Sequence, residues 1–442
     1  MARYKGAFVT TVVLALLVVA CDPTGGGEAT SNTATPANVT TPVSTSGVVD
    51  ITYSARLTGV GDDADAAVVD AFNKEFEGKY HVNRTAVDDE TYKTKQITQL
   101  TGDNAPDVFY MWAGGRAKDI IDAGFAAPLD GYYSQYGWNK ELNALGQSNA
   151  TFDGTKYFVP TMLSSSAVWY QPDIFAKEGI AVPTTFEELE AAAAKLKAAG
   201  IAPFILSNKD KWEAQFYWTH IVVAENGPQI YNNLVAGKAK WTDAPFVAAW
   251  QKLANWSKAG YYYGSPNSFG YAESTIPWTK GEAAMNVQGN WWPSTLAQSD
   301  SASPAKSDYF PFPAVSGKRS TMEIWAENTL MINAKSDKQH QDAASAFIDY
   351  YVSVEAQGVL AKAGRLFPSN INVDLTTLGL PDVMLKLANF MNSQSGDTFI
   401  HVDVAFTASI ANEWLDATQG VLNGTVTPAE AAKRVQDVAD QR

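Results

Sequence analysis

The chain has 442 residues and a formal charge of −14. This length is enough for two lobes that each bury a core, and the acidic balance argues against nucleic acid as a partner because it repels phosphate backbones. The 13 tryptophans and 19 tyrosines supply many flat apolar faces, which suit sugar rings whose hydroxyl groups need a few fixed polar partners.

Residues 1–20 have the features of a secretory signal peptide, since Arg3 and Lys5 precede an apolar run that is too short for a membrane span. Small residues then lead to Cys21, the chain's only cysteine, a pattern that resembles the lipobox of bacterial lipoproteins. The resemblance implies cleavage before Cys21 and a lipid on its sulfur; the alternative is an accidental cysteine. Residues 21–47 contain few bulky apolar side chains, so we expect a flexible tether and a protein that is anchored to a membrane without spanning it.

The sequence after residue 47 alternates between strand and helix patterns. It predicts strands at 48–54 and 81–87, helices at 64–76 and 90–100, and a third strand that ends at Trp112. This order is typical of an α/β fold with a mostly parallel sheet flanked by helices. Ligands gather at the carboxyl ends of such strands, so we expect Trp112 to form a binding platform and Gly114 to leave room for a ligand. The alternative for Trp112 is that it only covers the end of the sheet.

Capping residues mark the starts of several later helices. We expect helix starts at Thr185 with Glu188, at Ser336 with Gln339, and at Thr427 with Glu430, and a helix end at Gly200.

Small polar and aromatic residues in the middle of the chain are further candidates for ligand contacts. The family resemblance given below implies that Ser164 and Ser165 lie where the chain crosses between lobes, and their hydroxyl groups would then bond sugar; the alternative is that they are only solvated. Trp212, Gln215 and Trp218 share one helical face that is either core or cleft, and we assign Trp218 to the cleft.

A tandem tryptophan follows a run of small apolar residues that predicts a buried strand. The run ends at Gly289, which permits a sharp turn or a close approach to a ligand, and Trp291 and Trp292 come next. Pro293 is a plausible first helical residue, so the indoles would project from a strand-to-helix junction. Side chains alternate in a strand, so we expect one indole, Trp291, to stack on ligand and the other to pack inward. The alternative is that both are core residues.

A later strand over 322–333 places Trp325 and Glu327 on one face, where an indole and a carboxylate together would contact a sugar. The alternative for Glu327 is a structural or surface carboxylate. The family resemblance given below implies that Arg365 lies in a loop that returns between lobes, where it would bond sugar oxygens or lock a hinge.

Three of these segments resemble a known family. The patterns are G-x-A-A-M-x-x-x-G-x-W at 281–291, A-P-D-V-F-x-x-W at 105–112, and P-x-T-F-x-E-L at 183–189, with Phe186 where tryptophan is common. They are similar to segments of extracellular solute-binding proteins of the maltose-binding class, the receptors of ATP-driven sugar importers.

The resemblance implies a two-lobed fold with a ligand cleft between the lobes. Lobe 1 would contain 48–162 plus 330–366, and lobe 2 would contain 163–329 plus 367–442. In that family the tryptophan at the position of Trp291 stacks on sugar, so Trp112 would face Trp291, Trp292 or Trp325 across the cleft.

The function implied is capture of a di- or oligosaccharide and its delivery to a permease of the ABC type, by a monomer held outside the bacterial membrane, without cofactor, metal or catalysis. The run from Trp112 to Gly115 is similar to segments in receptors for β-linked disaccharides such as xylobiose or cellobiose. One alternative is a secreted glycoside hydrolase, although nothing singles out a carboxylate pair among Glu323, Glu327 and residues 88–90. Another is a receptor of the same fold for a non-sugar solute, although the four histidines form no metal cluster of recognisable spacing.

Overall fold

A computed structural model of the chain describes residues 47–57, 62–300, 306–364, 367–393 and 398–441. The expectations for the signal peptide, for Cys21 and for nearly all of the tether lie outside the described residues, and so does Arg365. The helices of the described ranges include none with the length and apolar character that a membrane crossing requires.

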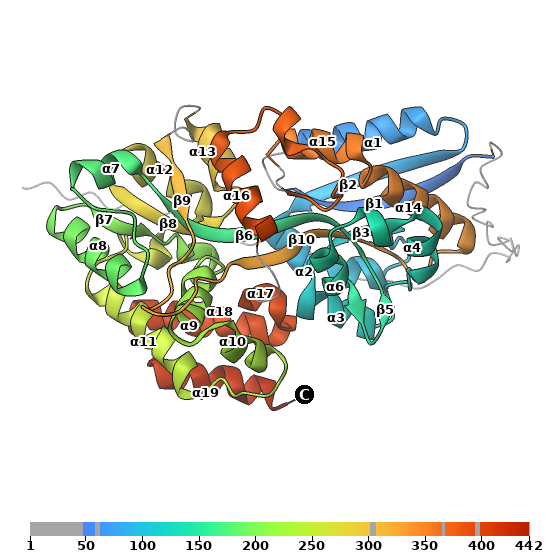
Figure 1. Cartoon of the computed structure of the whole chain (residues 1–442). Coiled ribbons are helices and arrows are strands. Elements are labelled where there is room, and N and C mark those ends of the chain that lie inside the picture. The colour runs from blue at the N-terminus through green and yellow to red at the C-terminus, as the bar shows by residue number, and fades with distance from the viewer. Residues whose placement is uncertain (1–46, 58–61, 301–305, 365–366, 394–397, 442) are drawn as a thin grey trace, which may run out of the picture. The chain divides into compact units, whose positions relative to one another are not determined.

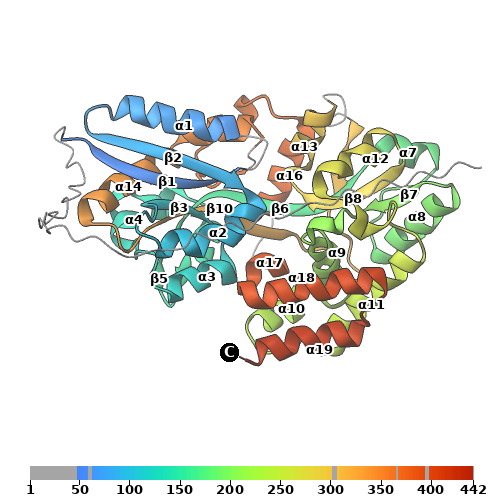
Figure 2. The same cartoon turned by 180° about the vertical axis from the view of Figure 1, so that it is seen from behind.

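The first five elements follow the order expected from the sequence. They are β1 (Val49–Leu57), α1 (Asp62–Glu75), β2 (Tyr80–Asp88), α2 (Asp89–Thr101) and β3 (Val108–Met111). β1 pairs in parallel with β2 along its whole length and with β3 at Tyr53 and Ser54. The predicted βαβαβ unit is therefore confirmed, and the carboxyl ends of β1 and β2 point toward the middle of the sheet (Figure 2).

The remaining elements are mainly helices that flank further strands (Figure 1). Up to residue 205 they are α3 (Gly114–Asp122), α4 (Asp130–Tyr136), α5 (Trp138–Glu141), α6 (Ala144–Asn149), β4 (Thr151–Phe152), β5 (Thr155–Lys156), β6 (Val159–Tyr170), α7 (Pro172–Lys177), α8 (Phe186–Ala198) and β7 (Ala202–Ile205). Up to residue 332 they are α9 (Ala214–Asn226), α10 (Pro228–Val235), α11 (Ala244–Lys258), α12 (Thr275–Thr279), β8 (Ala283–Gly289), α13 (Trp292–Ser299), β9 (Asp308–Phe310) and β10 (Glu323–Ile332). The last are α14 (Lys338–Tyr351), α15 (Val354–Lys362), β11 (Phe367–Pro368), α16 (Asp382–Ser393), α17 (Val402–Ala405), α18 (Ala408–Asn423) and α19 (Pro428–Ala439).

One mixed sheet connects most of the described strands. Its order is β2-β1-β3-β10-β6-β8-β7, and β9 and β11 also pair with β6. β10 runs antiparallel to both β3 and β6, and β6 runs antiparallel to β8. The α/β class is confirmed. The sheet is continuous because β6 and β10, with 12 and 10 residues, are long enough to pair at both ends.

Two of the predicted helix starts are confirmed and one is wrong. Thr185 and Glu188 form a capping box at α8, and Thr427 caps α19 by accepting a hydrogen bond from the Glu430 amide. At α14, however, Asp337 is the cap, because its carboxylate accepts from the His340 amide while the Ser336 hydroxyl donates to Asp107. The sequence offers two adjacent residues of suitable type there, and the later one is used.

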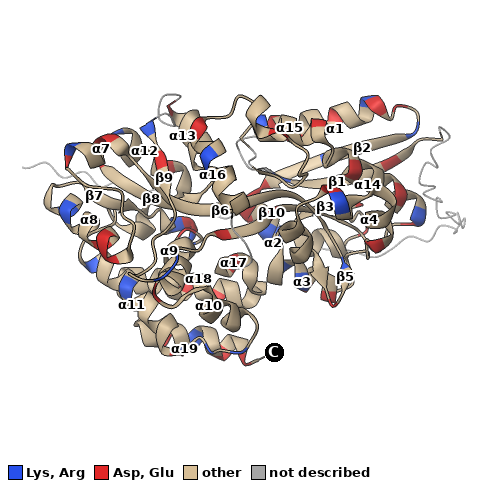
Figure 3. Ribbon diagram, in the orientation of Figure 1, with Lys and Arg blue, Asp and Glu red and all other residues tan. Residues whose placement is uncertain are grey.

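The buried side chains form two large hydrophobic clusters. One lies between β1 and the helices α1 and α14, where the ring centroids of Phe72 and Phe347 are 5.3 Å apart. The other surrounds α9, α11 and α18 and holds most of the buried tryptophans. Acidic and basic side chains are interspersed on outer helices such as α1 and α19 (Figure 3).

Candidate functional site

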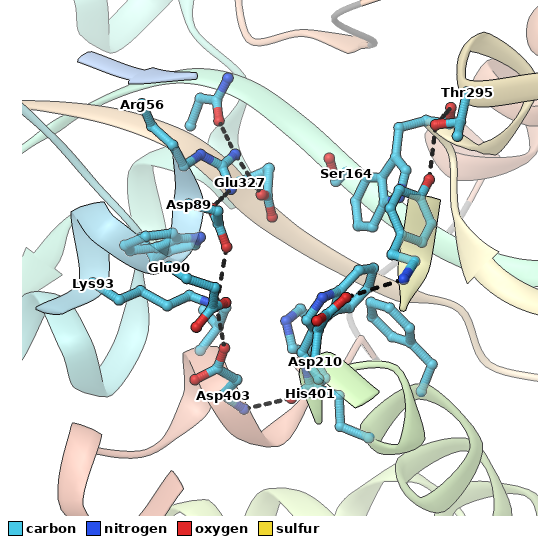
Figure 4. Close-up of a pocket in the computed structure, with 18 of the residues that line it drawn as sticks. Arg56, Asp89, Glu90, Lys93, Ser164, Asp210, Thr295, Glu327, His401 and Asp403 are labelled. Atoms are coloured by element: carbon cyan, nitrogen blue, oxygen red, sulfur yellow. Dashed lines mark hydrogen bonds and ion pairs between the residues drawn. The ribbon is translucent and has the colours of Figure 1, made fainter. Parts of the chain in front are cut away.

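A cavity of about 470 Å³ lies at the carboxyl ends of β1, β2 and β3. Arg56 lines it from near the end of β1, Asp88 from the end of β2, and Trp112 from directly after β3. The expectation that ligands bind at the carboxyl ends of the parallel strands therefore coincides with a cavity. Further lining comes from the interior of β6 and β10 and from residues at or just before the starts of α9, α13 and α17 (Figure 4).

Arg56 links three elements on one wall of this cavity. Its guanidinium donates to Asp89 at 2.7 Å, to Glu327 at 3.0 Å and to the side-chain oxygen of Asn328 at 3.1 Å (Figure 4). Burial acts to lower the pKa of Arg56, but the charges of Tyr110, Asp89 and Glu327 outweigh it and raise that pKa. Arg56 is therefore a fixed cation that orients two carboxylates.

Lys93 and Arg116 hold a third carboxylate, that of Asp403. Lys93 lies 3.0 Å from Asp89 and 3.6 Å from Asp403, and Arg116 donates through Nε to Asp403 at 3.0 Å. Burial acts to raise the pKa of Asp403, but the charges of Arg116 and Lys93 outweigh it and hold that pKa far below its usual range. Asp403 therefore stays ionised and connects α17 to α2 and α3.

Trp112 lines the cavity but is only 4% exposed. Its ring lies 5.1 Å from the Arg56 guanidinium carbon and 5.6 Å from Lys93 Nζ, and Tyr110 packs edge-on at 4.8 Å. The indole thus covers the end of the sheet, and an edge of it remains in the cavity; its role as a binding platform stays a prediction.

The more open aromatic surface lies on another part of the lining. Trp212, Tyr271 and Trp291 are each partly exposed, with centroid distances of 5.1 Å from Trp212 to Tyr271 and 6.3 Å from Trp212 to Trp291. Lys211, with φ of +71°, directs the chain into Trp212, an unusual conformation for a residue with a Cβ. The indole of Trp291 folds back over Gly289, where a Cβ would overlap its ring. The lack of a side chain at Gly289 therefore leaves the space that the Trp291 indole occupies.

The two tryptophans of the tandem pair are separated as expected, for a different reason. Trp291 lines the cavity, and Trp292 is fully buried with its ring edge-on to Trp278 at 5.5 Å. Trp291 has helical angles, φ −78° and ψ −10°, and Trp292 opens α13. The side chains therefore diverge by the rotation of a helix and not by the alternation of a strand.

Trp325 and Glu327 do share one side of β10. Trp325 is fully buried behind Trp291, at 6.0 Å and 82° between rings, and its Nε1 donates to the Glu327 carboxylate. Glu327 lines the cavity, whereas Trp325 supports it from behind. Ser164, which is paired with Trp325 in the sheet, also lines the cavity. Ser165 is buried, and its backbone exchanges hydrogen bonds with Asn290.

Two expected site residues lie elsewhere. Trp218 is fully buried in the core, 4.9 Å from Trp250 and 5.5 Å from Trp414, and does not line the cavity. Its partner on the predicted face, Gln215, does line the cavity, because α9 turns that side of its first turn toward it. Gly114 has φ of +69° and approaches the backbone of α17, where a Cβ would overlap the carbonyl oxygen of Val404. Its lack of a side chain makes room for α17.

Comparison with known families gives a match to the model for bacterial extracellular solute-binding proteins over residues 55–358. The chain belongs to this family. Among the described residues of this extracellular solute-binding protein, no group of three or more acidic, histidine or cysteine side chains is arranged to hold a metal ion.

Curated relatives match parts of this solute-binding protein. An uncharacterised ABC-transporter extracellular-binding protein of Pyrococcus horikoshii is 26% identical over 299 residues, which is 65% of each chain. An alpha-glucosides-binding periplasmic protein of Rhizobium meliloti is 27% identical over 192 residues, 39% of this chain and 42% of the relative. The matches thus span less than two thirds of these relatives' lengths.

Solved structures match over more of the solute-binding protein. One, described in connection with xylan utilization by Caldanaerobius polysaccharolyticus, is 25% identical with a TM-score of 0.79, over 88% of this chain and 99% of that one. A chitin oligosaccharide binding protein is 23% identical with a TM-score of 0.81, over 89% and 98%. These structures share the two-lobed α/β fold of the family.

The carboxylates of the cavity are arranged to accept hydrogen bonds. The pKa of Asp89 is lowered, since the charge of Arg56 outweighs the effect of burial, so Asp89 is unsuited to act as a general acid. Nearby, the hydroxyl of Ser166 bonds to Glu323, and Glu323 in turn bonds to His401. The Ser166 hydroxyl also lies 3.5 Å from His220 Nε2, but neither Ser166 nor His220 lines the cavity, so a ligand there does not reach this serine.

Sequence patterns did not indicate several of the residues that line the cavity. Arg56 closely follows the predicted first strand, so the rule that selected Trp112 would also have found it. Tyr271 and Asp210 lie in short turns without a periodic pattern. Asp403 lies 287 residues after its partner Arg116 in α3, and nothing in the local sequence indicates that α17, with His401 before it, packs there.

Proposed function

We propose that this solute-binding protein captures a di- or oligosaccharide in the cavity, without chemical change, and delivers it to an ABC permease in the membrane. The observation that carries the proposal is the partly exposed aromatic surface of Trp212, Tyr271 and Trp291 in one cavity with the acceptors Asp210 and Glu327. Aromatic faces pack on the C–H groups of a sugar ring, and carboxylates accept hydrogen bonds from its hydroxyl groups.

The names of several similar proteins support a saccharide as ligand. They include the alpha-glucosides-binding protein, a glucose-binding protein of Saccharolobus solfataricus, the chitin oligosaccharide binding protein and a maltose-bound protein of T. maritima. Several aromatic rings in one cavity favour more than one sugar unit. We therefore keep β-linked disaccharides such as xylobiose and cellobiose as the first candidates.

The mechanism that we propose is closure of two lobes, 48–162 plus 330–366 and 163–329 plus 367–442. An open form would predominate without ligand, and a saccharide that contacts both lobes would favour the closed form. Trp112, Ser164, Glu327 and Arg365 would contribute from around the hinge and the first lobe, and Trp291 from the second. We also propose anchoring by a lipid on Cys21, which would keep the monomer at the outer side of the membrane.

A thermal-shift screen tests the proposal directly. The purified chain from residue 22 is heated with xylo-, cello-, malto- and chito-oligosaccharides, with glucosides and with an amino-acid mixture. A ligand at about 100 times its Kd adds about 2.7 kcal/mol of stability, which is a clear rise in melting temperature. Calorimetry then gives the Kd, and chromatography of the recovered sugar checks that it is unchanged. A rise with amino acids alone, or cleavage of the sugar, would contradict the proposal.

A further inference from the structure

His401 is held rigidly at the cavity by a buried carboxylate. Its Nδ1 lies 2.8 Å from Glu323 Oε1, and Glu323 is fully buried at the start of β10. The other Glu323 oxygen accepts a hydrogen bond from Ser166 of β6. The carboxylate is thus fixed from a neighbouring strand and in turn fixes the imidazole.

Two aromatic rings fix the plane of the same imidazole. Trp325 packs edge-on against it at 4.5 Å and 85°, and Phe216 at 5.0 Å and 70°. The His401 side chain is only 5% exposed, yet it lines the cavity (Figure 4). Neither rotation of the ring nor a change of rotamer is available without loss of these contacts.

The hydrogen bond to Glu323 determines what the other ring nitrogen offers. A ring nitrogen that faces a carboxylate carries the proton, so Nδ1 is the donor of this pair. Nε2 has no hydrogen-bond partner among the described residues. Nε2 is also not among the buried unpaired polar atoms of the described residues, so it keeps contact with the cavity, where a ligand or water can complete its hydrogen bonding.

We propose that His401 is a specificity-determining residue of this site, whose Nε2 hydrogen-bonds a hydroxyl group of the bound saccharide. Glu323 is its positioning residue, which acts on the ligand only through the imidazole. The inference rests on the proposed function, because it assigns a role within the same cavity. Because the imidazole is fixed beside Trp325, it bonds a hydroxyl group at one position of the sugar only. Saccharides that differ at that position should therefore differ in affinity.

Affinity measurements on the wild type and three variants test the role. We would titrate xylobiose, cellobiose, N,N′-diacetylchitobiose and maltose by calorimetry into the wild type, His401→Phe, His401→Gln and Glu323→Gln. His401→Phe keeps the ring but removes both nitrogens, and we expect about a tenfold loss in affinity for the disaccharide that binds best, about 1.4 kcal/mol. His401→Gln retains a polar group at this position, so we expect its affinity to lie between that of His401→Phe and that of the wild type. Glu323→Gln should fall between wild type and His401→Phe.

His340 supplies a matched control, because it pairs with Asp337 at 2.9 Å in the same manner on the exposed start of α14. His340→Phe should leave every affinity within about twofold of wild type, a change of under about 0.5 kcal/mol. A loss of equal size in His340→Phe and His401→Phe would overturn the inference, since the effect would then not depend on the cavity.

A measurement on the wild type decides the question even if His401→Phe fails to fold. Nitrogen-15 spectra of the four imidazoles should show a shift of His401 Nε2 when the best disaccharide saturates the protein, and no shift for His340. If a disaccharide binds but neither this resonance nor the affinity of the folded variants changes, the inference is wrong and the proposed function stands. If neither these disaccharides nor the longer oligosaccharides of the thermal-shift screen bind the wild type, both are wrong.

Discussion

At the scale of single residues, the tandem tryptophan shows how adjacent side chains of one type acquire different tasks. Trp291 caps α13 and lines the cavity, while Trp292 opens the helix and is buried against Trp278. The sequence predicted the separation of the two indoles. It assigned the wrong cause, because Trp291 has helical angles at the start of α13 and does not continue the strand.

These two tryptophans form a matched pair for mutation. Trp291→Ala should weaken saccharide binding about tenfold, since an aromatic contact is worth ~0.5–1.5 kcal/mol beyond the area it buries. Its melting temperature should stay close to that of the wild type. Trp292→Ala should instead lower the free energy of unfolding by about 3–5 kcal/mol, because it leaves a cavity in the core. Calorimetric titration measures the affinity of both variants, and urea denaturation measures their free energy of unfolding. This view would be contradicted if Trp292→Ala lost affinity and Trp291→Ala lost stability, or if both variants changed alike.

At the scale of elements, the packing of α3 against α17 positions much of the site. Gly114 and Gly115 bring the start of α3 into direct contact with the backbone of residues 404–407, and the Ala408 amide donates to Asp119 at 2.9 Å. The sequence predicted the strands and helices up to β3 because their periodicity is local. It did not predict this contact, since the two glycines indicated space for a ligand equally well and their true neighbour is distant in the chain.

A methyl group at Gly115 tests this contact. Gly115→Ala should lower the midpoint of urea denaturation and reduce saccharide affinity, because a Cβ would overlap the backbone of Phe406 and push α17 away. Gly131→Ala is the control: it lies in α4 with open space around it and should be neutral or stabilising by up to about 1 kcal/mol. A wild-type midpoint and affinity for Gly115→Ala would mean that α17 can shift without consequence.

At the scale of the whole molecule, the ion pairs around Asp403 connect sequence-distant parts of the chain. Asp403 on α17 meets Arg116 of α3 and Lys93 of α2, and it is nearly buried. The resemblance of a few motifs was enough to predict the α/β class and the family. Motifs of this kind do not predict the ion pairs around Asp403, because these pairs depend on long-range contacts that bring the charged groups together.

The pH dependence of stability should reveal this network. The pKa of Asp403 is lower in the folded chain than the unfolded value of about 3.9, so the ion pair stabilises the protein above about pH 4 and is lost as the pH falls toward the folded pKa. Asp403→Asn should cost about 3–5 kcal/mol at pH 7, because it leaves Arg116 buried without its partner. The difference from wild type in urea denaturation should stay constant above about pH 5 and shrink as the pH falls below about 4.

An exposed ion pair provides the comparison. Asp122→Asn removes the partner of Lys118 at the surface of α3, where such pairs contribute about 0–1 kcal/mol. It should change the denaturation midpoint little at any pH. A cost for Asp403→Asn that is as small as that for Asp122→Asn would show that the buried network does not stabilise the fold.

The return strand β10 also constrains the order in which this protein can fold. Among the described residues, the edge of β3 and the part of the β6 edge over residues 159–166 pair with β10, so these edges stay open until about three quarters of the chain is available. Open strand edges associate with other chains. A nascent or truncated chain that ends before β10 therefore lacks a closed sheet and is prone to aggregate, which makes β10 the segment on which both solubility and the assembly of the cavity depend.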